Sequence, residues 1–233
     1  MGDTLPFLDP FDVILLDLNG TFMFGHDRFG PEQDYYATYQ ANGGTRMDRA
    51  AVTSMMDRIL RELLRVYEDP AHFDDFPSLS EAFTTFAGAP PDELPALCAT
   101  FAAHEVGEVP PSHVALLQQL SHSHRLGVVS NICDDHARWR EHFAAVGLGS
   151  AFTGTVFSSE ERSIKPSPRL FHEALAAIPD AQNILFVGDS CNRDMVPAKQ
   201  LGWATAWISA VNSGDVGCVI PNLLALPSVD VQA

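Results

Sequence analysis

Short apolar runs alternate with amphipathic stretches along most of the chain. Runs rich in Val, Ile, Leu and Phe that end at Gly, Ser or Asp are typical of buried strands, whereas wider apolar spacing is typical of helices. The runs occupy residues 13–16, 126–131, 154–159, 183–190 and 204–209. Continuous apolar strands separated by helices predict an α/β fold, a Rossmann-like parallel sheet with helices on both faces.

A long stretch without strand character separates the first apolar run from the second. Its apolar residues recur at helical spacing, which predicts three helices. These cover residues 46–67, 80–87 and 92–104, the first with Met47, Ala51, Met55, Ile59, Leu63 and Val66 on one face. We therefore expect a core formed by residues 1–30 and 108–233, with residues 31–107 inserted into it as an α-helical domain.

Composition and charge narrow the classes of function. The 233 residues are 46% hydrophobic and carry a formal net charge of −16, which disfavours nucleic acid and anionic lipid as partners. No apolar stretch reaches the ~18 residues of a membrane span, and the N-terminal residues lack the pattern of a secretion signal, which favours a cytoplasmic location. The four cysteines show neither disulfide nor metal-ligand spacing and are interpreted as free thiols.

Polar residues follow the ends of the predicted strands. Asp17 ends the first run, Ser130 and Asn131 end the second, and Asp189 ends the fourth. Because the carboxyl ends of parallel strands meet at one edge of a sheet, we expect these side chains to lie close together. A single Asp after a strand is also typical of a helix cap or a turn, so the series as a whole is what indicates a shared site.

Four motifs in a fixed order resemble those of the haloacid dehalogenase superfamily of hydrolases. They are Asp17-Leu18-Asn19-Gly20-Thr21, Ser130-Asn131, Lys165-Pro166, and Gly188-Asp189-Ser190 followed by Asp194. The resemblance covers essentially the whole chain. The helical insertion lies between the first and second motifs, as the C1-type cap does in that family.

The resemblance implies a phosphatase-like mechanism that uses Mg²⁺. Asp17 would attack phosphorus as a carboxylate nucleophile, and water would hydrolyse the resulting aspartyl-phosphate. The ion would be held by Asp17, the backbone carbonyl of Asn19 and Asp189, with Asp194 acting through a bound water. The alternative for Asp194 is an ordinary acidic residue in the first turn of a helix.

The resemblance also implies a set of phosphate-binding residues. Lys165 would neutralise the phosphate and hold the carboxylates, although a solvated surface lysine is the alternative for this residue. Ser130 and Asn131 would donate hydrogen bonds to the phosphoryl oxygens, and Thr21 and the Gly20 amide would do the same.

Asn19 departs from the pattern of the family's phosphatases. Those enzymes normally carry a second Asp here, which protonates the leaving oxygen and then activates water. Asparagine can orient a water but has no proton to exchange, and a positioned acid or base is worth ~10² to 10⁴ in rate. Asn19 therefore favours leaving groups that depart without a proton, such as the carboxylate of an acyl phosphate.

Three functions remain open at this point. The first is a Mg²⁺-dependent phosphatase that is slow or acts on activated phosphates, which the match of Lys165, Asp189 and Asp194 favours. The second is a metal-free hydrolase of carbon-halogen bonds, and the third is a phosphate-binding module that has lost turnover. For the first, we expect a small phosphorylated metabolite as substrate, whereas the oligomeric state is left open.

Substrate recognition in capped members of the family depends on the cap and on the segment after the first strand. Here that segment carries His26, Asp27 and Arg28, and the insertion adds Arg46 and Arg49. Arginines suit bidentate recognition of an anion. The alternative, that Arg46 and Arg49 lie on the solvated face of the long helix, is favoured by the helical pattern.

Overall fold

The computed structural model describes residues 7–134, 136–211 and 217–229. Its centre is a parallel sheet of six strands. They are β1 (Val13–Leu16), β2 (Arg125–Ser130), β3 (Phe152–Phe157), β4 (Ile184–Gly188), β5 (Ala204–Ile208) and β6 (Cys218–Ile220), in the order β3-β2-β1-β4-β5-β6. The predicted α/β fold is confirmed.

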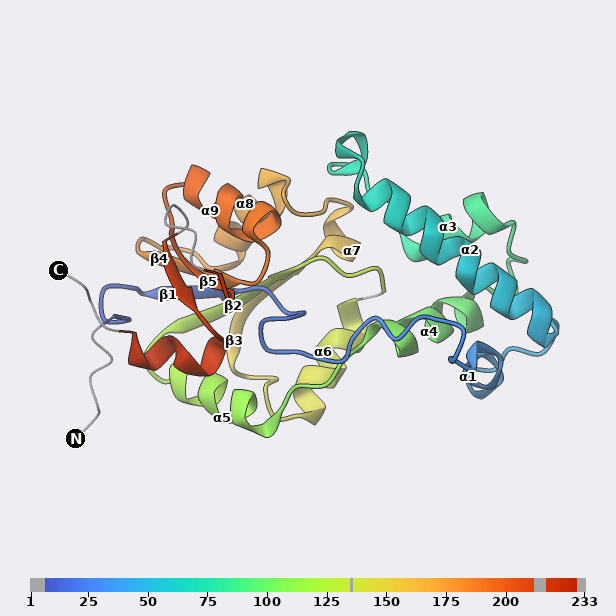
Figure 1. Cartoon of the computed structure of the whole chain (residues 1–233), viewed down its shortest axis with the longest axis horizontal. Helices are drawn as coiled ribbons and strands as arrows, with labels where there is room; N and C mark the ends of the chain where they lie inside the picture. Colours follow the sequence, from blue (N-terminus) through green and yellow to red (C-terminus); the bar gives the residue numbers. More distant parts are fainter. Residues whose placement is uncertain (1–6, 135, 212–216, 230–233) are drawn as a thin grey trace.

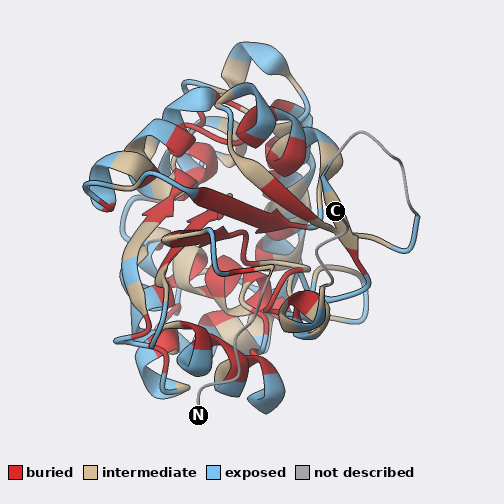
Figure 2. Cartoon of the chain, turned by 90° about the vertical axis from the view of Figure 1, so that its left-hand side faces the viewer, coloured by how far each residue is buried: buried red, intermediate tan, exposed pale blue. Residues whose placement is uncertain are grey.

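Helices cover both faces of this sheet (Figure 1). They are α5 (Pro111–Leu120) and α6 (His136–Ala145) on one face, and α8 (Pro168–Ala177) and α9 (Val196–Gln200) on the other. Successive residues of a strand point to opposite faces, so β1 supplies Ile14 and Leu16 to one apolar cluster and Val13 and Leu15 to the other. Burial of each such side chain contributes about 1.5–3 kcal/mol. The central strands β1, β2 and β4 are the most buried, and Figure 2 shows buried strands at the centre of the fold.

Four further helices pack on one another beside the sheet and are called the helical segment below (Figure 1). They are α1 (Tyr35–Ala41), α2 (Arg49–Tyr67), α3 (Leu79–Ala87) and α4 (Leu94–Glu105). The last three lie where the sequence predicts helices, whereas α1 was not predicted. The buried stripe of α2 holds Ile59, Leu63 and Val66 as expected, but begins at Val52 rather than Ala51.

The helical segment contacts the core through the loop that precedes α8. The backbone amide of Phe76 donates to the carbonyl of Arg162, and that of Ile164 donates to the carbonyl of Phe73, both at 2.8 Å. The elements beside this junction are the short helix α7 (Ser158–Glu161) and the 3₁₀ turn η1 (Pro70–His72). The junction therefore places the loop that carries Lys165 directly against the helical segment.

The strand order reverses at the centre of the sheet. After β1 the chain adds β2 and β3 on one side, and then returns to add β4, β5 and β6 on the other. In parallel sheets the crevice outside the carboxyl ends of the strands at such a reversal is the usual ligand site. The turn η2 (Cys191–Met195), a π-helical turn, follows β4 at this point, and the 3₁₀ turn η3 (Leu223–Ser228) follows β6. None of the helices in the described parts of the chain has the length and apolar character to cross a bilayer.

Candidate active site

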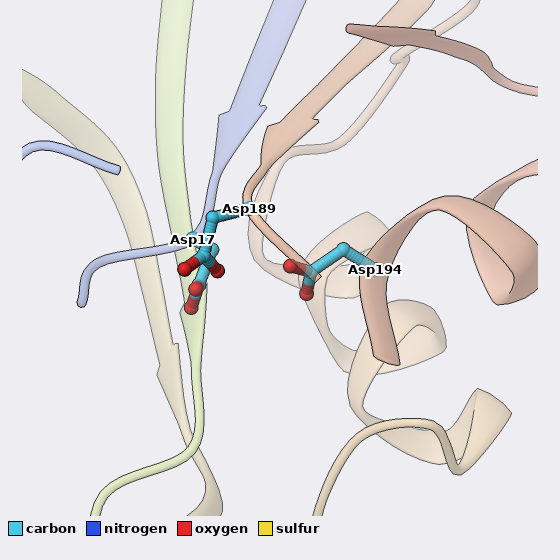
Figure 3. Close-up of side chains that lie close together, drawn as sticks. All are labelled: Asp17, Asp189 and Asp194. Carbon is cyan, nitrogen blue, oxygen red and sulfur yellow. The ribbon is translucent and has the colours of Figure 1, made fainter. Parts of the chain in front are cut away.

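Three carboxylates converge where the strand order reverses. Asp17 directly follows β1 and Asp189 directly follows the neighbouring strand β4, while Asp194 projects from η2 (Figure 3). One carboxylate oxygen from each of the three lies within 4.8 Å of the others. Asp17 and Asp194 are buried and Asp189 is exposed, so the group opens to solvent on one side.

Lys165 joins two of these carboxylates. Its Nζ donates to Oδ1 of Asp17 at 2.7 Å and to Oδ1 of Asp194 at 2.6 Å, and its side chain is buried. Burial on its own lowers the pKa of Lys165, but the two adjacent carboxylates outweigh it and raise that pKa. The lysine therefore stays charged, and removing it would leave two buried acids without their counter-ion.

The carboxyl groups of Asp189 and Asp194 have raised pKa values. Burial raises the pKa of Asp194 to about 7, opposed by Lys165 and reinforced by Asp17. Desolvation in the crevice also raises the pKa of Asp189, and the charge of Asp17 adds to this. Three carboxylates facing one lysine leave an excess of negative charge, which is the electrostatic character of a cation site.

Ser130 ends β2 and Asn131 follows it, and both make hydrogen bonds at the site. The Ser130 hydroxyl donates to Oδ1 of Asp17 at 2.9 Å. Asn131 instead holds the loop of Lys165, because its side-chain oxygen accepts the Lys165 amide at 2.7 Å and its Nδ2 donates to the Lys165 carbonyl at 3.2 Å. The same Nδ2 lies 3.0 Å from the hydroxyl of Tyr67. In this arrangement Asn131 positions Lys165 and Tyr67.

Gly20 and Thr21 lie outside the lining of the cavity to which Asn19 belongs. Asn19 lines the cavity with Asp17, whereas Gly20 and Thr21 are not among the lining residues. Gly20 has a φ of +75°, and a Cβ there would lie 2.2 Å from Oδ2 of Asp189, so only glycine fits. The Thr21 hydroxyl is fully buried and has no partner among the described residues. The predicted contact of Thr21 with a phosphoryl oxygen stays a prediction.

A cavity of about 610 Å³ connects the strand ends with the helical segment. His26 and Asp27 line it, whereas the guanidinium of Arg28 donates to the carbonyls of Gly25, Ala103 and Val106. The hypothesis that Arg28 recognises an anion is therefore wrong in this structure, because its donors face backbone. Arg46 and Arg49 are exposed and paired with Asp92 and Asp34. Arg49 thus lies on the solvated face of the long helix as the alternative predicts, whereas Arg46 precedes α2.

Arg193 and Tyr67 are site residues that the sequence did not reveal. The Arg193 guanidinium donates to the carbonyls of Lys165 at 2.6 Å and of Tyr67 at 2.9 Å, and it lies 3.7 Å from the centroid of the Tyr67 ring. Arg193 thus ties η2 and the lysine loop to the end of α2. The position of Arg193 between Asp189 and Asp194 in the sequence was a weak indication that it lies at the site. Nothing in the sequence indicated this for Tyr67.

Glu105 and Cys133 meet at the second-motif loop. The Glu105 carboxylate accepts the amides of Cys133 at 2.6 Å and Asp134 at 3.0 Å. Burial raises the pKa of Glu105 to about 8, helped by Asp27 and Asp134. Burial and Glu105 also raise the pKa of the Cys133 thiol well above its usual value, so Cys133 is not a reactive thiolate. The described structure holds all four cysteines as free thiols.

The indole of Trp207 contacts the loop after β4 from outside the cavity. The indole N–H of Trp207, on β5, donates to the backbone carbonyl of Asp189 at 2.9 Å. The loop after β4 is therefore anchored by the neighbouring strand as well as by η2.

The fold and the strand-end acids agree with the comparison with known families. The profile of the haloacid dehalogenase-like hydrolases matches residues 11–202, which is most of the chain. The chain belongs to this family and is a hydrolase.

Two relatives with assigned activities match a shorter part of the chain. Pyrimidine 5'-nucleotidase YjjG of Escherichia coli (strain K12) is 30% identical over 102 residues, which are 43% of this chain and 44% of that protein. Glyceraldehyde 3-phosphate phosphatase of Pyrococcus abyssi (strain GE5 / Orsay) is 31% identical over 101 residues, 43% of this chain and 42% of that protein. The matches thus span less than half the length of these relatives.

Solved structures share the fold over nearly the whole length. The 2-haloacid dehalogenase from Pseudomonas syringae pv. Tomato DC3000 has a TM-score of 0.64 at 21% identity, covering 94% of this chain and 97% of that chain. A HAD phosphatase from Thermococcus onnurineus has a TM-score of 0.60 at 20% identity, covering 93% and 96%. Dehalogenases and phosphatases therefore share this architecture, and the reaction must be argued from the site.

Proposed function

We propose that the chain is a Mg²⁺-dependent phosphatase that acts on a small phosphorylated substrate through an aspartyl-phosphate on Asp17. The observation that carries this proposal is the convergence of Asp17, Asp189 and Asp194 around Lys165. Attack on a carbon-halogen bond needs no metal, and the exposed Asp189 carboxylate beside the nucleophile would then have no cation to hold, whereas Asp194 pairs with Lys165 in either case.

The acidic group fits Mg²⁺ in its chemistry. This ion prefers oxygen ligands, with one or two carboxylates and several waters. One carboxylate oxygen from each of the three acids lies within 4.8 Å of the others, so the group can face a single ion. Asp17 and Asp189 would hold the ion with the Asn19 carbonyl, and Asp194 would act through a water. When bound, Mg²⁺ would offset the charge of the acids and of the phosphate.

The first step follows from the hydrogen bonds of Asp17. Ser130 and Lys165 both donate to Oδ1, so Oδ2 is the oxygen that attacks phosphorus. The bond from phosphorus to the leaving oxygen breaks, and its electron pair stays on that oxygen. Lys165 provides positive charge beside the transferring group, which stabilises the charge on its oxygens.

The second step releases phosphate. Water attacks phosphorus, the bond to Asp17 breaks, and the carboxylate is regenerated while the water proton passes to solvent. Asn19 lines the cavity beside Asp17 and can hold this water through its amide without taking its proton. We propose that residues 31–107 act as a cap that covers the core of residues 1–30 and 108–233 during the first step.

The test is hydrolysis of acetyl phosphate, whose leaving group needs no proton, with Mg²⁺ and with EDTA. We expect turnover that requires Mg²⁺ and that Asp17→Asn abolishes. Asn19→Asp introduces the acid and should increase turnover of alkyl phosphates by at least ~10²-fold.

Failure of both the natural protein and Asn19→Asp would contradict the proposal. Turnover of 2-haloacids without metal would then favour the carbon-halogen alternative. Binding of Mg²⁺ and phosphate without any turnover would favour a binding module.

A further inference from the structure

The helical segment contributes an apolar wall to the cavity. Six residues form it, and they are Leu60, Leu63, Leu64, Tyr67, Phe76 and Phe101. Tyr67 and Phe76 stand edge to face, with ring centroids 6.2 Å apart. Such a wall binds an apolar or aromatic group and offers little to a group that carries charge or many hydroxyls.

The cations among the lining residues of the described chain already have partners. Lys165 donates to Asp17 and Asp194. Arg193 donates to two backbone carbonyls and lies 3.2 Å from Glu68. His26 Nε2 lies 3.7 Å from Asp27. A carboxylate or a second phosphate on the substrate body would therefore meet no unpaired cation beside the apolar wall.

Two neutral side chains near this wall, Ser158 and Asn131, are also engaged, whereas Asn19 Oδ1 and His26 Nδ1 in the same cavity have no partner among the described residues. The Ser158 hydroxyl accepts the Ile132 amide at 2.9 Å and donates to the Ile132 carbonyl at 2.8 Å. Asn131 bonds to the lysine loop. The hydroxyls of a sugar would exchange water for these occupied groups, which costs affinity.

The end of the cavity that holds Asp17 and Asn19 also favours a substrate with an aromatic group. Asn19 supplies no proton, which favours a leaving oxygen that departs as an anion. An oxygen attached to an aromatic ring spreads this charge into the ring, whereas the oxygen of an alkyl group cannot.

From these two requirements together we infer that the substrate is a phosphate monoester of an aromatic alcohol whose ring carries no charge. This inference rests on the proposed function. The bond between phosphorus and the aryl oxygen breaks, the electron pair stays on the phenolate, and the phenolate takes a proton from water after release. The ring would lie against Leu64, Tyr67 and Phe76.

The inference is tested by binding, without turnover. Two phosphonates that cannot be hydrolysed, 1-naphthylmethylphosphonate and 4-carboxybenzylphosphonate, are titrated into the full chain with Mg²⁺ by calorimetry. We expect the naphthyl compound to bind at least tenfold more tightly. Equal affinities, or tighter binding of the charged compound, would overturn the inference.

A single substitution should weaken this preference. Leu64 is 56% exposed, so Leu64→Arg adds a cation to the wall without opening the buried core. We expect Leu64→Arg to bind the carboxylated compound at least tenfold more tightly than the natural protein does. The control is Leu224→Arg, at an exposed leucine in η3 outside the cavity, and it should leave both affinities unchanged. An equal gain in both variants would contradict the location of the ring.

Kinetics separate the two proposals. If acetyl phosphate is hydrolysed but 1-naphthyl phosphate and 4-carboxyphenyl phosphate have equal kcat/KM, the proposed function stands and the substrate inference fails. If the phosphonate preference is found but acetyl phosphate is not hydrolysed, the apolar wall is supported and the phosphatase proposal fails.

Discussion

One oxygen of Asp17 takes both of the hydrogen bonds that Ser130 and Lys165 supply. Because these donors meet at Oδ1, the carboxylate cannot rotate freely and Oδ2 keeps one direction. Holding a nucleophile in a reactive orientation removes part of the entropy barrier to attack. Asn131 extends this control, since it fixes the backbone of the lysine that fixes Asp17.

At Gly20 we predict that Gly20→Ala weakens Mg²⁺ binding by at least about tenfold. The added Cβ would lie 2.2 Å from Oδ2 of Asp189, so that carboxylate must move. The positive φ of +75° adds strain of roughly 1–2 kcal/mol. Calorimetric titration with Mg²⁺ measures the affinity, and urea unfolding measures the strain.

Gly25→Ala is the matched control for this prediction. Gly25 has a φ of +64°, and nothing lies within 4 Å of its added Cβ. It should lose a similar free energy of unfolding and keep its Mg²⁺ affinity. Equal loss of affinity in both variants would show that backbone strain, and not contact with Asp189, is responsible.

Among the elements, α3 shows how the helical segment is held by local signals. The Ser78 hydroxyl accepts the Glu81 amide, and the Glu81 carboxylate accepts the Ser78 amide at 2.9 Å, which forms a capping box. Glu81 also pairs with Arg162 of the core loop at 2.7 Å. The Arg162 guanidinium and the Ser78 amide lower the pKa of Glu81 to about 2.

We predict that Ser78→Ala lowers the free energy of unfolding by about 1 kcal/mol, because the first turn of α3 loses its cap. Ser80→Ala, at an exposed position two residues further on, should change it by less than about 0.5 kcal/mol. Urea unfolding at neutral pH distinguishes them. Equal losses would mean that the cap does not stabilise the fold.

The elements differ in how far the sequence foretold them. The long helix α2 has an apolar residue on nearly every turn, β1 and β4 are continuous apolar runs, and β2 and β5 are largely apolar. In contrast, α1 has seven residues and β6 has three, too few for a period to stand out. Their structure depends on tertiary contacts, which a local pattern does not contain.

The contacts within the site also differ in whether the sequence predicts them. Asp17 and Asp189 were predicted to meet because each directly follows a strand, and strand ends share an edge. The pairing of Asn131 with Tyr67, and of Arg193 with the same tyrosine, joins segments far apart in the chain. Such contacts are set by how the helical segment packs on the core, so no spacing in the sequence encodes them.

For the whole molecule, Glu105 is a buried titratable group between the helical segment and the core. It ends α4, and its carboxylate holds two amides of the loop after β2. In the unfolded chain the carboxyl ionises near pH 4.5, whereas in the fold its pKa is about 8. Between these values the unfolded state binds fewer protons, so the free energy of unfolding falls as pH rises.

We predict that Glu105→Gln makes stability less dependent on pH between about pH 5 and 8. The slope should become shallower by up to about 1 kcal/mol per pH unit. Gln offers one oxygen for two amides, so the variant is less stable at pH 5, and the slope is the informative quantity. Urea unfolding across this range measures it.

Glu108→Gln is the control, since Glu108 is exposed. It should leave the slope unchanged. An unaltered slope in Glu105→Gln would show that burial of Glu105 does not govern stability in this range.

Because Trp207 donates a hydrogen bond to the Asp189 carbonyl, its fluorescence can report on the site. Indole fluorescence responds to a nearby charge and to a change at its N–H, so binding of an ion beside Asp189 alters the emission of Trp207. The other two tryptophans are Trp139, which is buried, and Trp203, which stacks on Phe186. With both replaced by Phe, the natural residue at position 207 becomes a fluorophore that follows occupancy of the site in real time, without an attached dye.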